Sequence, residues 1–416
     1  MAAETGRFAP DARLAPARNK EGAMLSIPRA GAAALLLLSA GCVSGSGAGA
    51  DLGGGPMARA ADPGAVYWLY VGAESADLIH RIRFDGALTL DQTTMVGEIP
   101  TETEGPHGLR ISPDGRHLYM TTGHGFPDGK LWKFEAGPDT VVAEPILLGY
   151  FPATIDLTPD GLYAFVVNFN LHGEHVPSTV SVVYTPDLVE VEQIETCTMP
   201  HGARMAPDGL FLYSNCMMDE QVVEIDTRTF EVARRFSVAP GREGPLDAEG
   251  GGARMAGGMS GMGAGAMAGA QCSPTWVQPS PDGLSLYVAC NAGSRILHLD
   301  RQSWELTRVL QAGTGPYNLA ITPDGRLLVA TLKQGAGVEF FDLRTGESLA
   351  RVPTTTTVTH GVEVSPDSRY AFVSSEGVGA EPGKVDVFDL SDFSRVGDVE
   401  VGQQAGGIAF WRMELP

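Results

Sequence analysis

The stretch Gly108–Thr122 reads GLRISPDGRHLYMTT and places a Ser-Pro-Asp-Gly turn between two short apolar segments. Proline sets φ at the first central position of a turn, and Asp-Gly tolerates the tight corner that follows. The stretch therefore predicts a hairpin of two short antiparallel strands.

This hairpin is repeated along the chain. Its turn recurs as SPDG, TPDG, APDG, SPDG, TPDG and SPDS, with prolines at positions 113, 159, 207, 281, 323 and 366. The spacings between successive prolines are therefore 46, 48, 74, 42 and 43 residues. Two more strand-like segments follow each hairpin, for example VEFFDL and SLARVP after the fifth turn. Four strands in about 43 residues are typical of one blade of a β-propeller.

Six turns predict six blades, and the two ends of the chain supply a seventh. Residues 66–84 have the pattern of the second and third strands of a blade with no first strand before them. Residues 403–411 have the pattern of a first strand with nothing after it. Pairing these segments closes the ring and leaves no open sheet edge. We therefore predict an all-β fold, a seven-bladed β-propeller over residues 66–416, in which N-terminal strands pair with a C-terminal strand.

The turn and the strand after it also resemble a known family. Residues 282–300, DGLSLYVACNAGSRILHLD, are similar to the YVTN-type β-propeller repeat proteins, in which a PDG turn precedes an LYV-like strand. The resemblance extends over roughly residues 66–416 and implies a propeller of about seven blades. It does not imply a particular activity.

The N-terminal region has the features of an export signal. Arg29 precedes an apolar run, Ala30–Leu38, within the segment Met24–Cys42. This run is too short to span a bilayer and is typical of a signal peptide. We expect translation to start at Met24, because residues 1–23 look like neither a signal region nor part of a fold.

The end of this signal predicts a lipid anchor. Ser39-Ala40-Gly41-Cys42 resembles a bacterial lipobox, which implies cleavage before Cys42 and lipidation of its thiol. Residues 1–41 would then be a leader that is removed, and residues 42–65 a flexible tether rich in Gly, Ser and Ala. We therefore predict an exported, membrane-anchored lipoprotein that faces the periplasm or the cell surface.

The formal net charge of −21 at pH 7 argues against one class of partner. A strongly acidic protein repels the phosphate backbone, so we do not expect nucleic-acid binding. High net charge also favours solubility, and we expect a monomer.

Histidines occupy one face of the predicted propeller. If the PDG turns join the first and second strands on the lower face, then the entry of each first strand and the loop after each second strand lie on the upper face. The residue six positions before the PDG proline is histidine in three blades, each time followed by glycine. The histidines at these entries are His107, His201 and His360. The loops after the second strands add His124, His172 and His175.

Sulfur-containing residues gather at the same face. Cys197 precedes a first strand and Cys216 ends a second one, and Cys272 and Cys290 repeat this arrangement one blade later. Two methionines, Met217 and Met218, follow Cys216 directly. The long 74-residue spacing contains an insertion, residues 239–271, that is rich in glycine and methionine. Its methionines are Met255, Met259, Met262 and Met267.

Two interpretations of this face follow from the residue types. Imidazole, thiolate and thioether groups suit copper, so the histidines, Cys216 and the methionines of this face are candidate copper ligands. Alternatively, Cys197–Cys216 and Cys272–Cys290 form disulfides in an oxidising compartment, and the face binds an envelope protein, peptide or glycan without catalysis. A propeller hydrolase or lactonase with a carboxylate-bound ion is a third alternative, for which carboxylates such as Glu174, Asp219 and Glu376 are available. No serine nucleophile elbow, phosphate-binding loop or haem-attachment motif occurs in the sequence, and whether the protein is an enzyme stays open.

A ring of charged residues is predicted below the histidines. It lies three residues beyond the strand entries and includes Arg110, Asp156, Arg204 and Glu363. Arginine and aspartate alternate in neighbouring blades, so we expect salt bridges between blades around the channel.

Overall fold

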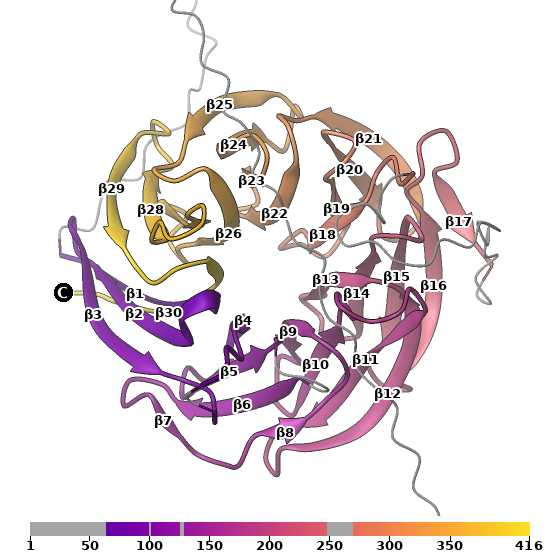
Figure 1. The fold of residues 1–416 in the computed structure, drawn as a ribbon. Coiled ribbons are helices and arrows are strands. Elements are labelled where there is room, and N and C mark those ends of the chain that lie inside the picture. Colours follow the sequence, from indigo (N-terminus) through magenta and orange to yellow (C-terminus); the bar gives the residue numbers. More distant parts are fainter. Residues whose placement is uncertain (1–63, 100, 125–128, 248–268) are drawn as a thin grey trace, which may run out of the picture. The chain divides into compact units, whose positions relative to one another are not determined.

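The computed structural model describes residues 64–99, 101–124, 129–247 and 269–416. These residues form seven antiparallel sheets arranged around a central axis, as Figure 1 shows. The predicted all-β, seven-bladed propeller is therefore confirmed. No helix in the described ranges is long and apolar enough to cross a bilayer.

Each blade runs from an inner strand at the axis to outer strands at the rim. Blade 1 contains β4 (Pro106–Ile111), β5 (His117–Thr122), β6 (Lys130–Glu135), β7 (Thr140–Val141) and β8 (Ile146–Leu147). Blade 2 contains β9 (Pro152–Leu157), β10 (Tyr163–Asn168), β11 (Pro177–Tyr184) and β12 (Val189–Thr198). Blade 3 contains β13 (Pro200–Met205), β14 (Phe211–Cys216), β15 (Gln221–Asp226), β16 (Glu231–Ser237) and β17 (Gly244–Leu246).

The next three blades have four strands each. Blade 4 contains β18 (Pro274–Pro279), β19 (Ser285–Cys290), β20 (Arg295–Asp300) and β21 (Glu305–Gln311). Blade 5 contains β22 (Pro316–Ile321), β23 (Leu327–Leu332), β24 (Gly337–Asp342) and β25 (Ser348–Pro353). Blade 6 contains β26 (Val358–Val364), β27 (Tyr370–Glu376), β28 (Lys384–Asp389) and β29 (Arg395–Glu400).

Blade 7 joins the two ends of the described chain. Its inner strand is β30 (Ala405–Glu414), which pairs with β1 (Val66–Ala73), followed by β2 (Leu78–Phe84) and β3 (Leu88–Met95). A short 3-10 turn, η1 (Glu74–Ala76), connects β1 and β2. The predicted closure is therefore confirmed, with one difference at the boundary. Ala65, which we assigned to the tether, is buried and packs in the core of this blade.

The PDG turns are closed by their own side chains. In blade 1 the Gly115 amide donates to the Ser112 carbonyl at 2.8 Å, and the Ser112 hydroxyl donates to Asp114 Oδ1 at 2.6 Å. Gly115 has φ +72°, a conformation that glycine adopts without the steric cost of a Cβ. In the sixth turn Ser368 takes this position with φ 60°.

The hydrophobic core lies between the faces of neighbouring blades. One cluster combines Phe165 and Val182 of blade 2 with Leu212 and Val223 of blade 3, all fully buried. Because strand side chains alternate between two faces, each blade contributes to the core on either side of it. The inner strands are thereby held in place around the axis.

Two disulfides cross-link the described chain, one between β12 of blade 2 and β14 of blade 3 and the other between the entry of blade 4 and its strand β19. Cys197 is bonded to Cys216, and Cys272 is bonded to Cys290. The two predicted disulfides are therefore confirmed.

The insertion 239–271 is not a plain loop at its start, because residues 244–246 add β17 to the outer edge of blade 3. Met255, Met259, Met262 and Met267 lie outside the described residues, as do the leader 1–41 and Cys42.

Candidate functional site

The candidate site lies where the inner strands begin, on the face opposite the PDG turns. His107 and His201 are the second residues of β4 and β13, and His360 occupies the same position relative to its turn in β26. The glycine after each histidine has a packing role. A Cβ added at Gly108 would lie 2.3 Å from the Ala153 carbonyl oxygen, which belongs to the next blade. The His-Gly pairs thus combine a glycine that lets adjacent blades approach with a histidine at the entry of the inner strand.

The three histidines meet around the channel mouth. The ring centroid of His107 lies 5.9 Å from that of His360 and 6.4 Å from that of His201. Tyr317, at the entry of blade 5, stands between the other two, 5.5 Å from His201 and 4.7 Å from His360. All three histidines line a cavity of about 40 Å³, which is enough for one or two waters or an ion.

Each imidazole contacts an acceptor through one of its two nitrogens. His107 Nδ1 lies 3.0 Å from Glu74 Oε1, and His201 Nδ1 lies 2.9 Å from the Thr275 carbonyl oxygen. Because a carbonyl only accepts, Nδ1 of His201 carries the proton, and its Nε2 accepts from the Tyr317 hydroxyl at 3.0 Å. His360 Nε2 lies 3.7 Å from Glu376 Oε1. His360 Nδ1 is buried and has no hydrogen-bond partner among the described residues.

Glu74 connects the entry histidine of blade 1 with the loop after its second strand. Its carboxylate is buried, and Oε1 also lies 2.6 Å from His124 Nε2, while Oε2 accepts from Gln404 at 2.9 Å. Burial by itself raises the pKa of Glu74, but the charge and hydrogen bond of His107, together with the hydrogen bond of His124, outweigh it and lower the pKa below its usual range. The site therefore contains a buried, ionised carboxylate.

The opposite side of the mouth contains the imidazoles of His201 and His360, which are uncharged, and the ammonium group of Lys333. Burial, with a smaller contribution from His107, lowers the pKa of His201 to about 3. Burial, followed by the charge of Lys333, lowers the pKa of His360 well below its usual range. Lys333 lies 3.1 Å from Glu376 and 4.4 Å from the centroid of the Tyr317 ring. At neutral pH, His201 and His360 therefore present uncharged imidazoles to the channel.

Charged side chains form a second layer three residues further along the inner strands. Arg110 Nε lies 2.8 Å from Asp156 Oδ1 in the neighbouring blade. Glu363, on the far side of the channel, lies 3.8 Å from Arg110 and 3.9 Å from Arg204. Arg204 also stacks over Trp276 at 4.3 Å. The structure thus brings together the four residues of the predicted ring, with Glu363 bridging the two arginines.

The sulfur candidates do not join the histidines. Cys216 is in a disulfide, so it offers no thiolate, contrary to its interpretation as a metal ligand. Met217 is buried with Phe151, Phe169 and Met199, and Met218 packs against this cluster. Both methionine side chains serve packing, so we also withdraw them as metal ligands.

The loop histidines differ in position. His124 packs against Phe151, with ring centroids 5.0 Å apart, and lies 5.6 Å from the exposed His172. Burial, followed by the charge of His124, lowers the pKa of His172. His175 is exposed, and no contact joins it to the other histidines within the described ranges.

Sequence reasoning missed three residues of this site: Glu74, Tyr317 and Lys333. Lys333, Glu376 and His124 all stand at the ends of second strands, and Glu74 follows β1, the second strand of blade 7. Polar residues at this repeat position are the signal that could have found Glu74 and Lys333, whereas Tyr317 stands at the strand-entry position of the histidines.

In the described part of the chain, no group of three or more His, Cys, Asp or Glu side chains is already arranged to hold a metal ion. A bound ion would therefore require the imidazoles to come closer together than they lie here.

Comparison with known proteins supports the architecture. No family model matches the chain. A solved structure of hydrazine synthase from Kuenenia stuttgartiensis is similar, with a TM-score of 0.53 and 20% sequence identity over 71% of this chain and 80% of that chain. At this identity the likeness shows the fold alone. The class that fold and site define is a disulfide-containing seven-bladed β-propeller with a histidine-lined channel mouth.

Proposed function

We propose that this protein is an exported, YVTN-type β-propeller that binds a transition-metal ion, copper first, through His107, His201 and His360 at the channel mouth. The observation that carries the proposal is the orientation of the three imidazoles. His107 and His201 each contact an oxygen acceptor through Nδ1, so Nε2 is the nitrogen that each could offer to an ion, and in His201 this nitrogen now accepts from the Tyr317 hydroxyl. His360 faces Glu376 through Nε2, and its buried Nδ1 has no hydrogen-bond partner in the described part of the chain.

This pattern is the one that metal-binding histidines need. A ligating imidazole generally donates its other N–H to a carboxylate or a carbonyl, which fixes the ring and raises its basicity. Glu74 and the Thr275 carbonyl supply these contacts to His107 and His201. The low pKa values of His201 and His360 also keep their rings unprotonated, which coordination requires.

The donor set favours nitrogen chemistry. Both cysteine pairs are oxidised, so the site offers imidazoles, the phenol of Tyr317 and the carboxylate of Glu74. Imidazole suits copper, zinc and nickel, and among divalent first-row ions copper binds nitrogen sites most tightly. Coordination by His201 would replace its hydrogen bond from Tyr317. Copper bound here would supply a redox-active or Lewis-acidic centre.

The disulfides support an oxidising, exported location. In this proposal, Cys42 carries the lipid that attaches the protein to a membrane, and the propeller faces the periplasm or the cell surface.

The test is a titration of the purified mature protein with Cu(II), read by calorimetry and by electron paramagnetic resonance, which reports nitrogen ligands. We expect saturation near one ion per chain with histidine nitrogen coupling. His107→Gln and His360→Gln should each abolish tight binding.

His298→Gln is the matched control. His298 stacks on Tyr287 in blade 4 and contacts Ser285, away from the channel. Equal copper uptake by the wild type and the channel variants would refute the proposal and favour a non-catalytic scaffold that binds an envelope protein or glycan.

A further inference from the structure

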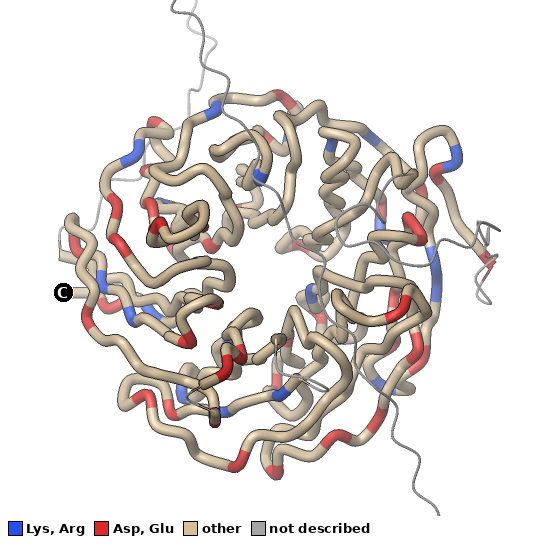
Figure 2. Tube along the Cα trace, in the orientation of Figure 1, with Lys and Arg blue, Asp and Glu red and all other residues tan. Residues whose placement is uncertain are grey.

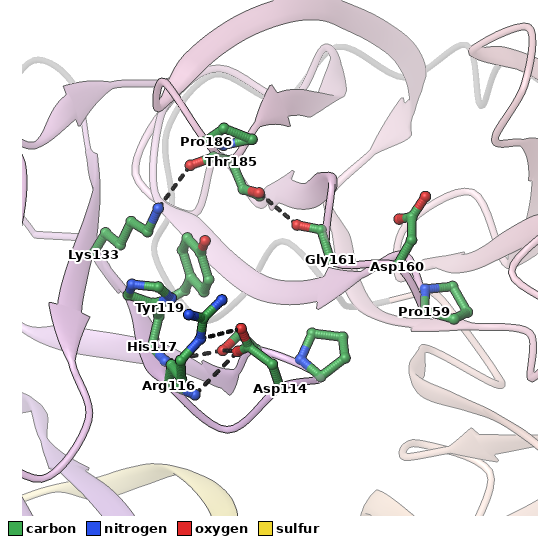
Figure 3. A pocket seen from close by; sticks show the side chains of 12 residues that line it. Asp114, Arg116, His117, Tyr119, Lys133, Pro159, Asp160, Gly161, Thr185 and Pro186 are labelled. Atoms are coloured by element: carbon green, nitrogen blue, oxygen red, sulfur yellow. Dashed lines mark hydrogen bonds and ion pairs between the residues drawn. The ribbon is translucent and has the colours of Figure 1, made fainter.

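A second cavity lies between blades 1 and 2, at the PDG-turn ends of the strands. It has a volume of about 500 Å³, within the range of small-molecule sites of roughly 300–1,000 Å³. Tyr119 and Lys133 of blade 1 line it together with Thr185 of blade 2 (Figure 3). It is separate from the channel-mouth histidines, and the inference below does not depend on the proposed metal function.

The equivalent place between blades 3 and 4 is filled by a side chain. Arg301 of blade 4 reaches back to blade 3, where it donates to Asp208 Oδ2 at 2.8 Å and to the Tyr213 hydroxyl. It also donates to the Gly283 carbonyl of its own blade at 3.1 Å.

The two places correspond residue by residue. Asp114 and Tyr119 stand at the same positions after their turn proline as Asp208 and Tyr213 do. The backbone amides of Thr185 and Arg301 make the same contact, each donating at 2.9 Å to the residue after the turn glycine, Leu162 or Leu284. Threonine therefore stands where blade 4 has arginine, and its hydroxyl bonds to the Gly161 carbonyl. An arginine at position 185 would extend into this cavity, as Arg301 extends toward blade 3.

The residue that pairs with the tyrosine on the next strand also has the opposite charge in the two blades. Tyr213 pairs across the sheet with Glu224, whereas Tyr119 pairs with Lys133. Glu224 is an anion that pairs with Arg234 of its own blade at 2.7 Å and accepts from the Tyr213 hydroxyl, which also contacts Arg301. Lys133 is a cation at a cavity, and Figure 3 shows its side chain extending toward Thr185.

Lys133 has one hydrogen bond and no ion pair with a carboxylate within the described residues. Its Nζ donates to the Thr185 carbonyl at 2.9 Å, which leaves two of the three ammonium donors. The carboxylates of the lining are already engaged: Asp114 by Ser112 and Arg116, and Asp160 by Thr158 and the Leu162 amide.

Lys133 is therefore a cation with donors left over, next to a cavity, in a chain of net charge −21. Acidic residues are spread around the rim of the propeller, as Figure 2 shows, so the surroundings favour cationic solutes. Because these acidic residues repel anions, an anion is retained only where it makes a specific contact, and Lys133 supplies one.

We propose that the cavity between blades 1 and 2 binds a small anionic molecule, of about the size of a sugar acid, whose carboxylate or phosphate group contacts Lys133. The ligand occupies the place between blades 1 and 2 that corresponds to the position of Arg301 between blades 3 and 4, and its negative charge complements Lys133.

The experiment is isothermal titration calorimetry on the mature protein with glucuronate and inorganic phosphate as probes, and glucose as the uncharged comparison. Lys133→Met removes the charge and keeps the aliphatic stem against Tyr119. Thr185→Arg introduces the residue that blade 4 has at this position. Lys384→Met is the control, because Lys384 lies on blade 6, away from the cavity, where it pairs with Asp398 at 2.9 Å.

We expect at least one anionic probe to saturate the wild type and the Lys384 control, while glucose does not. Lys133→Met should weaken binding by about tenfold to a hundredfold, the worth of a hydrogen bond to a charged group. Thr185→Arg should abolish it, with a thermal unfolding midpoint near that of the wild type.

Absence of binding by both anions, or equal binding by Lys133→Met, overturns the proposal. Tighter binding by Thr185→Arg also overturns it, because added positive charge would then matter and the cavity would not.

Discussion

The substitution Asp156→Asn tests whether the charged layer in the channel stabilises the propeller. Asp156 is 2% exposed, and it accepts from Arg110 Nε at 2.8 Å and from the Met205 amide at 2.8 Å. Asparagine removes the charge, after which Arg110 keeps only Glu363 at 3.8 Å. It also leaves one oxygen to accept from Arg110, the Met205 amide and the Leu157 amide, which now share two.

The magnitude follows from these contacts. Breaking a buried ion pair costs about 3–5 kcal/mol, and a hydrogen bond to a charged group is worth about 1.5–3 kcal/mol. Because the Arg110 side chain is 32% exposed to the channel, solvent compensates part of this loss. We therefore expect Asp156→Asn to lower the free energy of unfolding by about 2–4 kcal/mol.

The assay is urea unfolding followed by tryptophan fluorescence, with Asp226→Asn as the matched control. Asp226 pairs with Arg228, whose side chain is 62% exposed, so this substitution should cost less than about 1 kcal/mol. A loss for Asp156→Asn no larger than that of the control would refute the reasoning. The double variant Arg110→Met/Asp156→Leu should recover stability relative to Asp156→Asn, because it leaves no unpaired charge.

Three further predictions concern packing, protonation and cross-linking. Gly108→Ala should destabilise the protein by about 1–3 kcal/mol, because the added Cβ meets the Ala153 carbonyl. Gly397→Ala, which has open space around its Cβ, should be near neutral. Equal thermal unfolding midpoints for the two variants would contradict the packing role of Gly108. Lowering the pH from 7 to 5 should cost about 2 kcal/mol through His201, because its folded pKa of about 3 lies below the unfolded value of 6.5. The stability that the neutral His201 contributes is complete above pH 6.5 and is lost as the pH falls toward 3. The urea midpoint of His201→Gln should therefore depend less on pH than that of the wild type. Parallel pH profiles for the two proteins would contradict a buried neutral imidazole. Replacing Cys197 and Cys216 by serine should lower the free energy of unfolding by about 3 kcal/mol, as expected for a loop of 19 residues, and an unchanged urea midpoint would contradict a structural disulfide.

The fold was predictable because its determinants are local and repeated. Each PDG turn fixes one hairpin through contacts within a few residues, as between Ser112, Asp114 and Gly115, and the repeat spacing counts the blades. Closure was also predictable, since incomplete blades at both ends require each other. The strand β17 was not, because its residues Gly244–Leu246 follow no repeat and pair only with the outer strand β16 of a single blade.

The site was predictable only where it follows the repeat. The entry histidines stand at equivalent positions, so the sequence placed them on one face. Glu74 was missed because it comes from the closing blade, which has no PDG turn, and contacts His107 across 33 residues of sequence. Met217 was assigned to the metal site from its residue type and its place after a second strand, whereas packing against Phe151 of another blade decides its role.

The most direct measurement is the metal and free-thiol content of the mature protein, expressed with its own signal and purified without chelator or affinity metal. The account predicts about one copper ion per chain, no free thiol in denaturant, and loss of the copper in a His107/His201/His360 triple alanine variant. Absence of copper, with no uptake on titration, would contradict the metal site at the channel mouth. Copper retained by the triple variant would place the ion elsewhere in the chain.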